Sequence, residues 1–409
     1  MTKILPFRAI RPTRDKAYLV ATMPYYTYKK NVLEAKMEQN PYTFLHVINP
    51  EFHSRLKTPA NTVERFLKSK EKFKQFIKEG IFIQDENPCL YLYRQTKDGH
   101  EYLGLIGGAS IDQYNTGHIK KHEATITSRL DLFSTYLKTV QFNAEPVLLF
   151  HQRHEELCGL LEAISTHRPE YEFTSTEKIK HEIWVIDNAE AIAQIQKYYT
   201  EIPDVYIADG HHRCASSARF TESMPEPRKP EHEHFLAYFI SQEKMFIMEY
   251  NRVVRDLGNL TEASFLKKVA DNFSVSEILN DHIKPSSLHQ ISMYLNKKWY
   301  SLVPNPEKYD AKHAVNSLDS AILTNLLLEP VLNIKDLKTD ERIDFVSGNK
   351  GHQGITDAVD SGKFKVGFLL FPVSADQLMR VADEDQIMPP KSTWIEPKLR
   401  SGLTIYPLD

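Results

Sequence analysis

The stretch Val205-Tyr206-Ile207-Ala208-Asp209-Gly210-His211-His212-Arg213 is the most informative part of the sequence. Its apolar start is typical of a short buried strand, and Asp-Gly then interrupts the pattern. Glycine permits a sharp turn, and residues 214–220 continue with a helix-like pattern. The sequence therefore predicts a strand, a tight turn and a helix over residues 205–220, with Arg213 in a concave site.

The residue types of this turn suit a phosphate group. The first N–H groups of a helix point outward, and with the helix dipole they attract anions. Arg213 adds a planar fork that matches phosphate or carboxylate, and His211 and His212 can transfer protons near neutral pH. The alternative interpretation is a strand–turn–helix with a solvent-exposed His-His-Arg corner.

Alternating strands and helices surround this turn in the sequence. Residues 146–150, 183–186 and 205–208 are typical of short buried strands, and residues 189–199 of a helix. This order favours the α/β class, with α+β as the alternative. An amphipathic helix is predicted over residues 63–78, and Asp98-Gly99 predicts a hairpin turn.

Changes in pattern indicate two domains. Prolines and charges over residues 224–234 predict a surface loop, and residues 235–240 and 245–250 predict a strand pair. Apolar residues resume their own periodicity after about residue 255. We expect residues 1–255 to form an α/β core that carries the turn. Residues 256–409 are expected to form a second lobe whose C-terminal Lys-Ser-Thr segment folds back on the site.

A second polar cluster lies at residues 118–129, His-Ile-Lys-Lys-His-Glu-Ala-Thr-Ile-Thr-Ser-Arg. Its side chains, including Glu123, are dense enough to bind a phosphate or hold a metal. His118 and His122 are one helical turn apart, so both would face one ligand on a helix. The further ligand of a metalloprotease motif is missing. A solvated helix face remains the alternative.

A third cluster, Met388-Pro389-Pro390-Lys391-Ser392-Thr393-Trp394-Ile395-Glu396-Pro397-Lys398, lies near the C-terminal end. Lys391 would neutralise a phosphate, and Ser392 and Thr393 would donate hydrogen bonds to its oxygens. The glycines of a Walker loop are missing, and a proline-bounded loop with incidental polarity is the alternative. The glycine-rich residues 348–354 are a weaker candidate and are interpreted mainly as a plain loop.

Composition excludes several classes of protein. The chain has 409 residues and a net charge of −3, which does not point to nucleic acid or an anionic membrane. No apolar run is long enough to cross a bilayer. The three cysteines are far apart and odd in number, which fits a reducing cytoplasm. We expect a cytoplasmic protein with no membrane or nucleic-acid partner, and a homodimer is left open.

Four motifs in order resemble a family of bacterial and archaeal proteins known as domain of unknown function number ten-fifteen. They are Asn40-Pro41-Tyr42, His122-Glu123-Ala124-Thr125, residues 208–213 and residues 388–393. The resemblance spans nearly the whole chain, and the family name implies no activity. The family usually has Pro-Pro-Tyr-Asp at an early turn. This chain has Met-Pro-Tyr-Tyr at residues 23–26, so no role of that aspartate carries over.

The Asp-Gly-His-His-Arg turn alone resembles the Gly-x-x-Arg signature of the ParB/sulfiredoxin superfamily, which includes nucleotide hydrolases, sulfiredoxins and free-serine kinases. This resemblance implies a ParB/sulfiredoxin-like core with additional lobes, and a turn that holds nucleotide phosphates. Sulfiredoxin has a cysteine directly after the glycine, where this chain has His211. Thiol redox chemistry is therefore not implied, and Cys214 is interpreted as a packed helix residue.

Two functions follow from these patterns and resemblances. The first is a phosphotransferase that uses ATP or ADP with Mg²⁺ and acts on a small hydroxyl metabolite, such as free serine. The second is a ParB-like nucleotide-binding or sensor protein without metabolic catalysis. Turnover of nucleotide that depends on a metabolite would separate the two.

The phosphotransferase hypothesis gives each candidate residue a role. Asp209 would orient the turn or hold Mg²⁺. The remaining roles are phosphate binding, by Gly210, Arg213, Lys391, Ser392, Thr393 and His122, and acceptance of the hydroxyl proton, by His211, His212 or Glu123.

Overall fold

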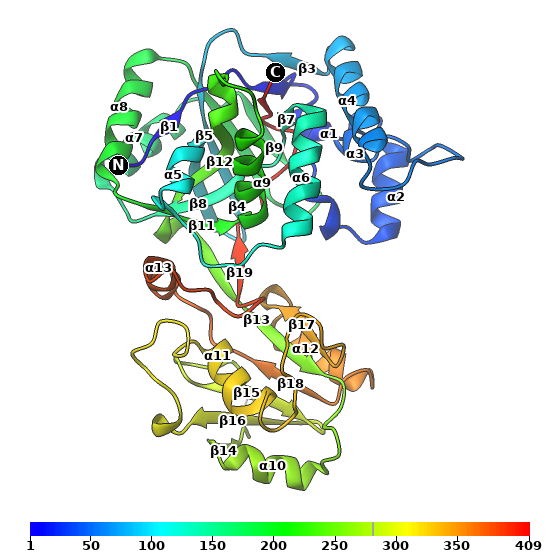
Figure 1. Cartoon of the computed structure of the whole chain (residues 1–409), viewed down its shortest axis with the longest axis vertical. Coiled ribbons are helices and arrows are strands. Elements are labelled where there is room, and N and C mark those ends of the chain that lie inside the picture. The colour runs from blue at the N-terminus through cyan, green and yellow to red at the C-terminus, as the bar shows by residue number, and fades with distance from the viewer. Residues whose placement is uncertain (280–281) are drawn as a thin grey trace. The chain divides into compact units, whose positions relative to one another are not determined.

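The computed structural model describes residues 1–279 and 282–409. The chain divides into two compact units (Figure 1). The first unit contains residues 1–120, 124–245 and 397–409, and the second contains residues 121–123 and 246–396. Within the described residues, no helix is both long and apolar enough to cross a membrane.

The first unit is built on one large mixed sheet. The strands of this large sheet are β1 (Ile4–Leu5), β4 (Leu90–Lys97), β5 (His100–Ser110), β6 (Ile119–Lys120), β8 (Val147–His151), β9 (Tyr171–Thr174), β10 (Lys180–Ile186), β11 (Val205–Asp209) and β12 (His234–Ser241). Two further strand pairs of this unit lie outside it, β2 (Ile10–Pro12) with β3 (Phe82–Gln84) and β7 (Phe142–Asn143) with β20 (Tyr406–Pro407). The sheet order is β6-β11-β8-β12-β5-β4-β10-β9, with β1 paired to β5. Two of its pairs, β11 with β6 and β12 with β8, are parallel.

Helices connect many of these strands. They are α1 (Ala17–Val20), α2 (Lys30–Gln39), α3 (Leu45–Ile48), α4 (Val63–Lys78), α5 (Ile111–Asn115), α6 (Thr127–Val140), α7 (Glu155–Ser165), α8 (Ala189–Glu201) and α9 (His211–Glu222), with short 3₁₀ turns η1 (Tyr25–Thr27), η2 (Pro230–Glu233) and η3 (Gln242–Lys244). Helices packed on a sheet with parallel and antiparallel pairs confirm the predicted mixed α/β class.

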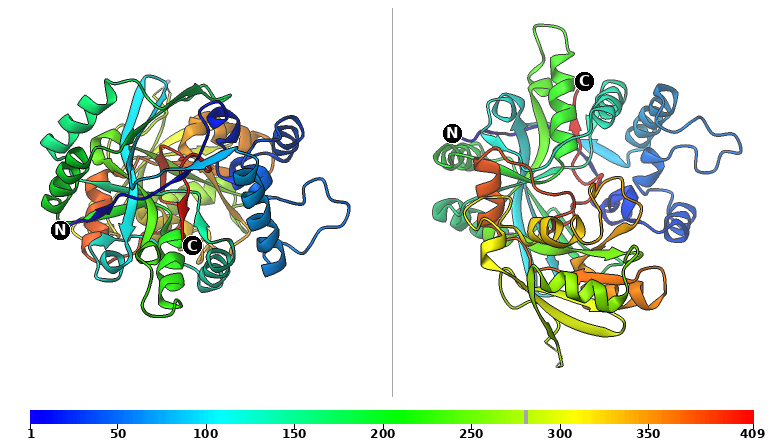
Figure 2. Two further views of the ribbon diagram at one scale, coloured as in Figure 1. Left: turned by 90° about the horizontal axis from the view of Figure 1, so that it is seen from above. Right: turned by 60° about the horizontal axis from the view of Figure 1, so that its bottom comes forward.

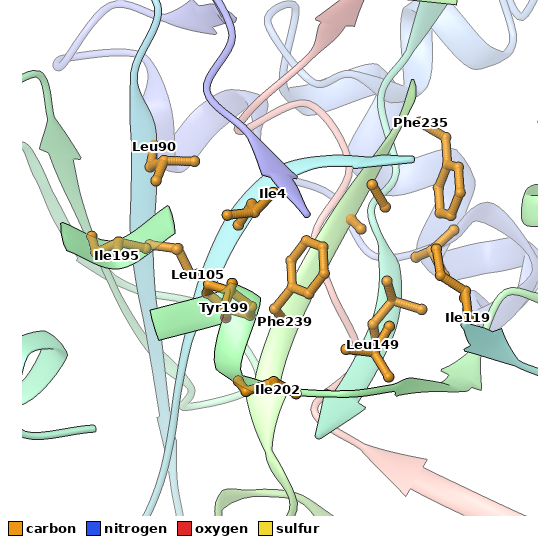
Figure 3. Close-up of a cluster of buried hydrophobic side chains, with 14 of the residues drawn as sticks. Ile4, Leu90, Leu105, Ile119, Leu149, Ile195, Tyr199, Ile202, Phe235 and Phe239 are labelled. Atoms are coloured by element: carbon orange, nitrogen blue, oxygen red, sulfur yellow. The ribbon is translucent and has the colours of Figure 1, made fainter. Parts of the chain in front are cut away.

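The main core of this unit lies between the sheet and its helices (Figure 3). Leu105, Leu149 and Phe239, from three neighbouring strands, meet Ile195 and Tyr199 of α8, and all five are at most 1% exposed. Each fully buried large side chain contributes about 1.5–3 kcal/mol to folding. Helices α7 and α8 lie side by side (Figure 2). Residues of β11 and α9 belong to the same cluster, so packing fixes both elements that flank the Asp-Gly turn.

The second unit has its own seven-stranded sheet and core. Its strands are β13 (Phe246–Val254), β14 (Phe273–Glu277), β15 (Ile291–Leu295), β16 (Lys298–Pro304), β17 (Ile343–Ser347), β18 (Val366–Leu369) and β19 (Thr393–Glu396). Its helices are α10 (Glu262–Ala270), α11 (Asp319–Leu323), α12 (Gly351–Asp360) and α13 (Ala375–Asp383), with the 3₁₀ turns η4 (Pro306–Lys308) and η6 (Gly348–Lys350) and the π-helical turn η5 (Thr324–Leu328). The sheet order is β14-β16-β15-β18-β13-β17, with β19 paired to β13.

Two local predictions are confirmed. The helix predicted over residues 63–78 is α4, and the Thr62 hydroxyl caps it by accepting a hydrogen bond from the Arg65 N–H at 3.3 Å. The predicted hairpin is formed by β4 and β5. Its turn residues Asp98 and Gly99 have φ values of +51° and +81°, as a two-residue hairpin turn with left-handed residues requires.

Two predictions for the middle of the chain are confirmed only in part, since both strands form, as β12 and β13, and residues 224–229 belong to no helix or strand. Strands β12 and β13 do not pair, because β12 lies between β5 and β8 while β13 pairs with β17, β18 and β19. The apolar run of β12 is buried by two neighbours from earlier in the chain. Residues 224–234 are also not wholly a surface loop, because His232 in η2 is 9% exposed and its Nε2 lies 2.8 Å from the Leu408 carbonyl oxygen.

Candidate functional site

The predicted strand, tight turn and helix over residues 205–220 are confirmed. Strand β11 ends at Asp209, Gly210 follows with φ of +108°, and α9 begins at His211. Only glycine adopts such a φ without strain. Cys214 is fully buried in the core cluster, as expected of a packed helix residue, and burial raises the pKa of its thiol.

We expect Gly210→Ala to destabilise the protein by about 1–3 kcal/mol, because a positive φ strains alanine. The new Cβ would also lie 3.0–3.2 Å from three atoms of the Arg213 guanidinium group. Urea unfolding measures the effect. Gly159→Ala in α7 is the control, since no atom lies within 4 Å of its Cβ position and alanine is preferred in a helix by about 1 kcal/mol. Equal midpoints for both variants would contradict this account of the turn.

Arg213 joins the end of β11 to the segment before β8. Its Nη1 donates to Glu145 Oε1 at 2.5 Å and to the Pro146 carbonyl oxygen at 2.9 Å, and its Nη2 donates to Asp209 Oδ2 at 2.7 Å. The Ser401 hydroxyl lies 3.5 Å from the other oxygen of Glu145. The side chain is 24% exposed. The guanidinium group is therefore paired with two carboxylates, and a phosphate would have to replace or share one of them.

Asp209 lies between two cations. Its Oδ1 is 3.9 Å from the Nζ of Lys398, and its Oδ2 accepts from Arg213. Burial raises the pKa of this carboxyl, but the charges of Lys398 and Arg213 lower it more, so the pKa lies below its ordinary value of 3.8. Asp209 therefore stays ionised and orients the two cations. A Mg²⁺ ion at this carboxylate would have to compete with both of them.

This lowered pKa gives stability a definite pH dependence. The folded protein binds a proton at Asp209 less readily than the unfolded chain, so ionised Asp209 stabilises the fold at neutral pH. That contribution is lost as the pH falls through the folded-state pKa, below 3.8. We expect Asp209→Asn to show a smaller drop in melting temperature between pH 7 and pH 3 than the unmodified protein. An equal or larger drop would contradict the assignment.

The two histidines of the turn have different surroundings. His211 is 4% exposed, and its charge is one of those that lower the pKa of Asp209. His212 accepts a hydrogen bond at Nε2 from the backbone N–H of Ile126, at 3.1 Å. In a neutral ring the accepting nitrogen carries no proton, so this bond assigns the proton to Nδ1. His212 thus holds part of the 118–129 stretch against the turn.

The prediction that His118 and His122 share a helical face is wrong. The intervening residues Ile119 and Lys120 form β6, which pairs with β11, and Ile119 is 2% exposed. Burial of this apolar side chain beside β11 favours a strand over a helix. His118 Nδ1 instead lies 3.1 Å from the Asp204 carboxylate.

The second unit contains the other predicted site residues. The carbonyl oxygen of His122 accepts from the Met388 N–H at 2.9 Å, so the motifs at 122–123 and 388–393 adjoin each other. Lys391 is exposed, and its Nζ lies 5.4 Å from the centroid of the Tyr250 ring. Thr393 begins β19.

Ser392 is held by its own loop. It is 4% exposed, donates to the Pro389 carbonyl oxygen at 2.7 Å, and lies 3.0 Å from the Ser320 hydroxyl. These contacts of Ser392 agree with the alternative interpretation of the segment, a proline-bounded loop with incidental polarity. The glycine-rich residues 348–354 are not a plain loop, because residues 348–350 form η6 and residues 351–354 begin α12.

Sequence reasoning missed two residues of the Arg213 cluster. Glu145 is separated from Arg213 by 68 positions, and Lys398 belongs to a predicted motif but had no role assigned. The only local signal is that Glu145 directly precedes Pro146 and the apolar run of β8.

Comparison with known proteins shows the family to which the chain belongs. A family model described as "Protein of unknown function (DUF1015)" matches residues 4–321, and no curated protein matches the sequence. Among solved structures, a free serine kinase in complex with AMP is 12% identical with a TM-score of 0.36, covering 74% of this chain and 91% of that one. SbnI with a C-terminal truncation, from Staphylococcus aureus, is 10% identical with a TM-score of 0.40, covering 74% and 87%. Because the family model matches well over half of the sequence, the chain belongs to the DUF1015 family.

Proposed function

We propose that the protein is a phosphotransferase that uses ATP or ADP with Mg²⁺ and phosphorylates a small hydroxyl metabolite, such as free serine. The observation that carries the proposal is the cluster at the start of α9. There the ionised Asp209 orients both Arg213 and Lys398, and the positive end of the helix dipole faces the same turn. Phosphoryl transfer depends mainly on positioning and on neutralising charge.

Arg213 and the turn supply phosphate contacts in this proposal. Gly210 has no side chain, so a phosphate can approach the backbone closely. A phosphate oxygen would replace Glu145 on Nη1 of Arg213, while Asp209 keeps the other arm of the guanidinium in place.

His211 is the proposed acceptor of the hydroxyl proton. It lies close enough to Asp209 for their charges to interact, and a carboxylate next to an imidazole orients the ring and stabilises its protonated form. His212 is less suited because its Nε2 already accepts from the Ile126 N–H. Glu123 is the alternative acceptor.

The test is a reaction of purified protein with Mg²⁺, ATP or ADP and a panel of hydroxyl metabolites, followed by phosphorus NMR. We expect a new phosphomonoester signal with one metabolite and none when metabolite is omitted. Absence of both product and nucleotide binding across the panel would contradict the proposal.

A nucleotide sensor without catalysis is the second candidate. It is favoured by the pairing of Arg213 with two carboxylates and by the backbone hydrogen bond at His212, which are typical of a structural turn. A thermal-shift titration with nucleotides separates the candidates. Stabilisation by nucleotide together with no turnover for any metabolite would favour the sensor.

A further inference from the structure

A charged side chain occupies an apolar row of the second unit's sheet. Arg252 on β13 lies opposite Phe345 on β17 and opposite Phe368 on β18, and Met293 follows Phe368 in the same row. Arg252 is 0% exposed and is the largest fully buried side chain among the described residues. An apolar residue would pack at this position without bringing a charge into the interior.

The guanidinium group of Arg252 has few partners. Its Nη1 donates to the Tyr250 carbonyl oxygen, and its Cζ lies 5.6 Å from the centroid of the Phe345 ring. Within residues 1–279 and 282–409, neither its Nε nor its Nη2 has a hydrogen-bond partner, and both atoms are buried. Burial lowers the pKa of Arg252 to about 9, so the group still carries its charge at neutral pH.

The two unpartnered nitrogens, Nε and Nη2, form the edge of the guanidinium group through which arginine donates two hydrogen bonds to a carboxylate. In this chain, Nε and Nη2 of Arg94 donate to the two oxygens of Glu182 at 2.8 and 3.0 Å. The same edge of Arg153 donates to Glu155 at 2.6 and 2.8 Å. Two parallel N–H groups match carboxylate and phosphate equally well. Arg252 thus buries an edge that elsewhere in the molecule holds an oxyanion.

We propose that this edge of Arg252 binds an oxyanion, the phosphate or carboxylate group of a small ligand, within the second unit. A buried charge is stable only when it is paired and hydrogen-bonded, and an oxyanion supplies both conditions. Phe345 borders the guanidinium group and contacts the Tyr250 ring, and both side chains are only partly buried, so their rotation would open a route to Arg252. Lys391 above the Tyr250 ring adds a second positive charge on that route.

The experiment uses the full chain and inorganic phosphate as the probe, with acetate in a parallel series and chloride at matched ionic strength. Melting temperature is measured for the unmodified protein, Arg252→Met and Arg252→Lys. Arg168→Met is the matched control, because Arg168 is exposed and makes no ion pair or hydrogen bond among the described residues. Phosphate also stabilises proteins generally by exclusion from their surface, and the control measures that part.

We expect Arg252→Met to melt at a higher temperature than the unmodified protein in chloride, because it removes an unpaired buried charge. Phosphate or acetate should raise the melting temperature of the unmodified protein and of Arg168→Met by a few degrees beyond the general salt effect. Arg252→Met should not show this rise. Arg252→Lys keeps the positive charge but lacks the two parallel N–H groups of arginine. It should lose the anion-dependent rise in melting temperature and should not melt higher than the unmodified protein in chloride. The anion that gives the larger rise identifies the ligand group.

The opposite pattern would overturn the proposal. If Arg252→Met melts lower in chloride and responds to both anions like the control, Arg252 serves packing alone. Should that variant not fold, NMR decides on the unmodified protein. The Nε–H signal of Arg252, identified by its absence in Arg252→Lys, is expected to shift during titration with phosphate or acetate. A signal that moves with neither anion rejects the site.

Discussion

Replacement of Arg213 by methionine is expected to lower the rate of phosphotransfer about tenfold to a hundredfold. Loss of one charge-assisted phosphate contact costs about 1.5–3 kcal/mol, and each 1.4 kcal/mol is about a factor of ten in rate. The variant also leaves Glu145 and Asp209 without the cation that pairs them, so repulsion between the carboxylates should move the turn. Initial rates by phosphorus NMR and nucleotide affinity by calorimetry measure both effects.

Arg153→Met is the matched control for this prediction. Arg153 also bridges two carboxylates, those of Glu155 and Glu243, but it does so on the surface and its side chain is 42% exposed. The control should keep the activity and affinity of the unmodified protein. Arg213→Lys should fall between the two, because lysine retains the charge and loses the fork. Full activity in Arg213→Met would remove Arg213 from the phosphate site.

Replacement of His211 by asparagine is expected to lower the rate by about 10²–10⁴-fold, the usual contribution of a positioned proton acceptor. Nucleotide affinity should change little, because the phosphate contacts remain. The expected signature is therefore a lower kcat with a nearly constant KM for nucleotide, together with loss of the low-pH limb of the rate profile. Measurement of kcat between pH 5 and pH 9 tests this signature.

His212→Asn is the control for this second prediction. The sequence alone assigns the same role to both histidines. Because His212 Nε2 accepts from the Ile126 N–H, the His212 variant should mainly loosen the 118–129 stretch and cause a smaller loss of rate. A larger loss in His212→Asn than in His211→Asn would reverse the assignment of the proton acceptor.

Local patterns predict the elements that local forces determine. The helix α4 and the Asp98-Gly99 hairpin follow from amphipathic spacing, a capping threonine and left-handed turn residues, all of which act within a few positions. The pairing of β12 does not follow from such patterns. Its partners β5 and β8 come from earlier segments, and the short turn between β12 and β13 looks in sequence like a hairpin connection.

The same distinction applies to the candidate site. The turn at Asp209-Gly210 is visible in sequence because a buried strand and a glycine mark it. The pairing of Arg213 with Glu145 is not visible, since 68 positions separate them and neither belongs to a common motif. Arg252 is hidden for a different reason. Charged residues in a strand are normally assigned to its exposed face, whereas this one lies between Phe345 and Phe368.

The first unit is made of segments from both ends of the chain, and this has a consequence for protein synthesis. This unit includes residues 397–409, in which Ile405 is a fully buried core residue and β20 pairs with β7. A ribosome makes these residues only after the 151 residues that run from Phe246 to Glu396 in the second unit. The second unit can therefore fold during translation, while the first keeps an open edge at β7 until the last strand emerges. We expect ribosome-bound chains stopped before residue 397 to be sensitive to protease within the first unit, even though its sheet strands have already been made.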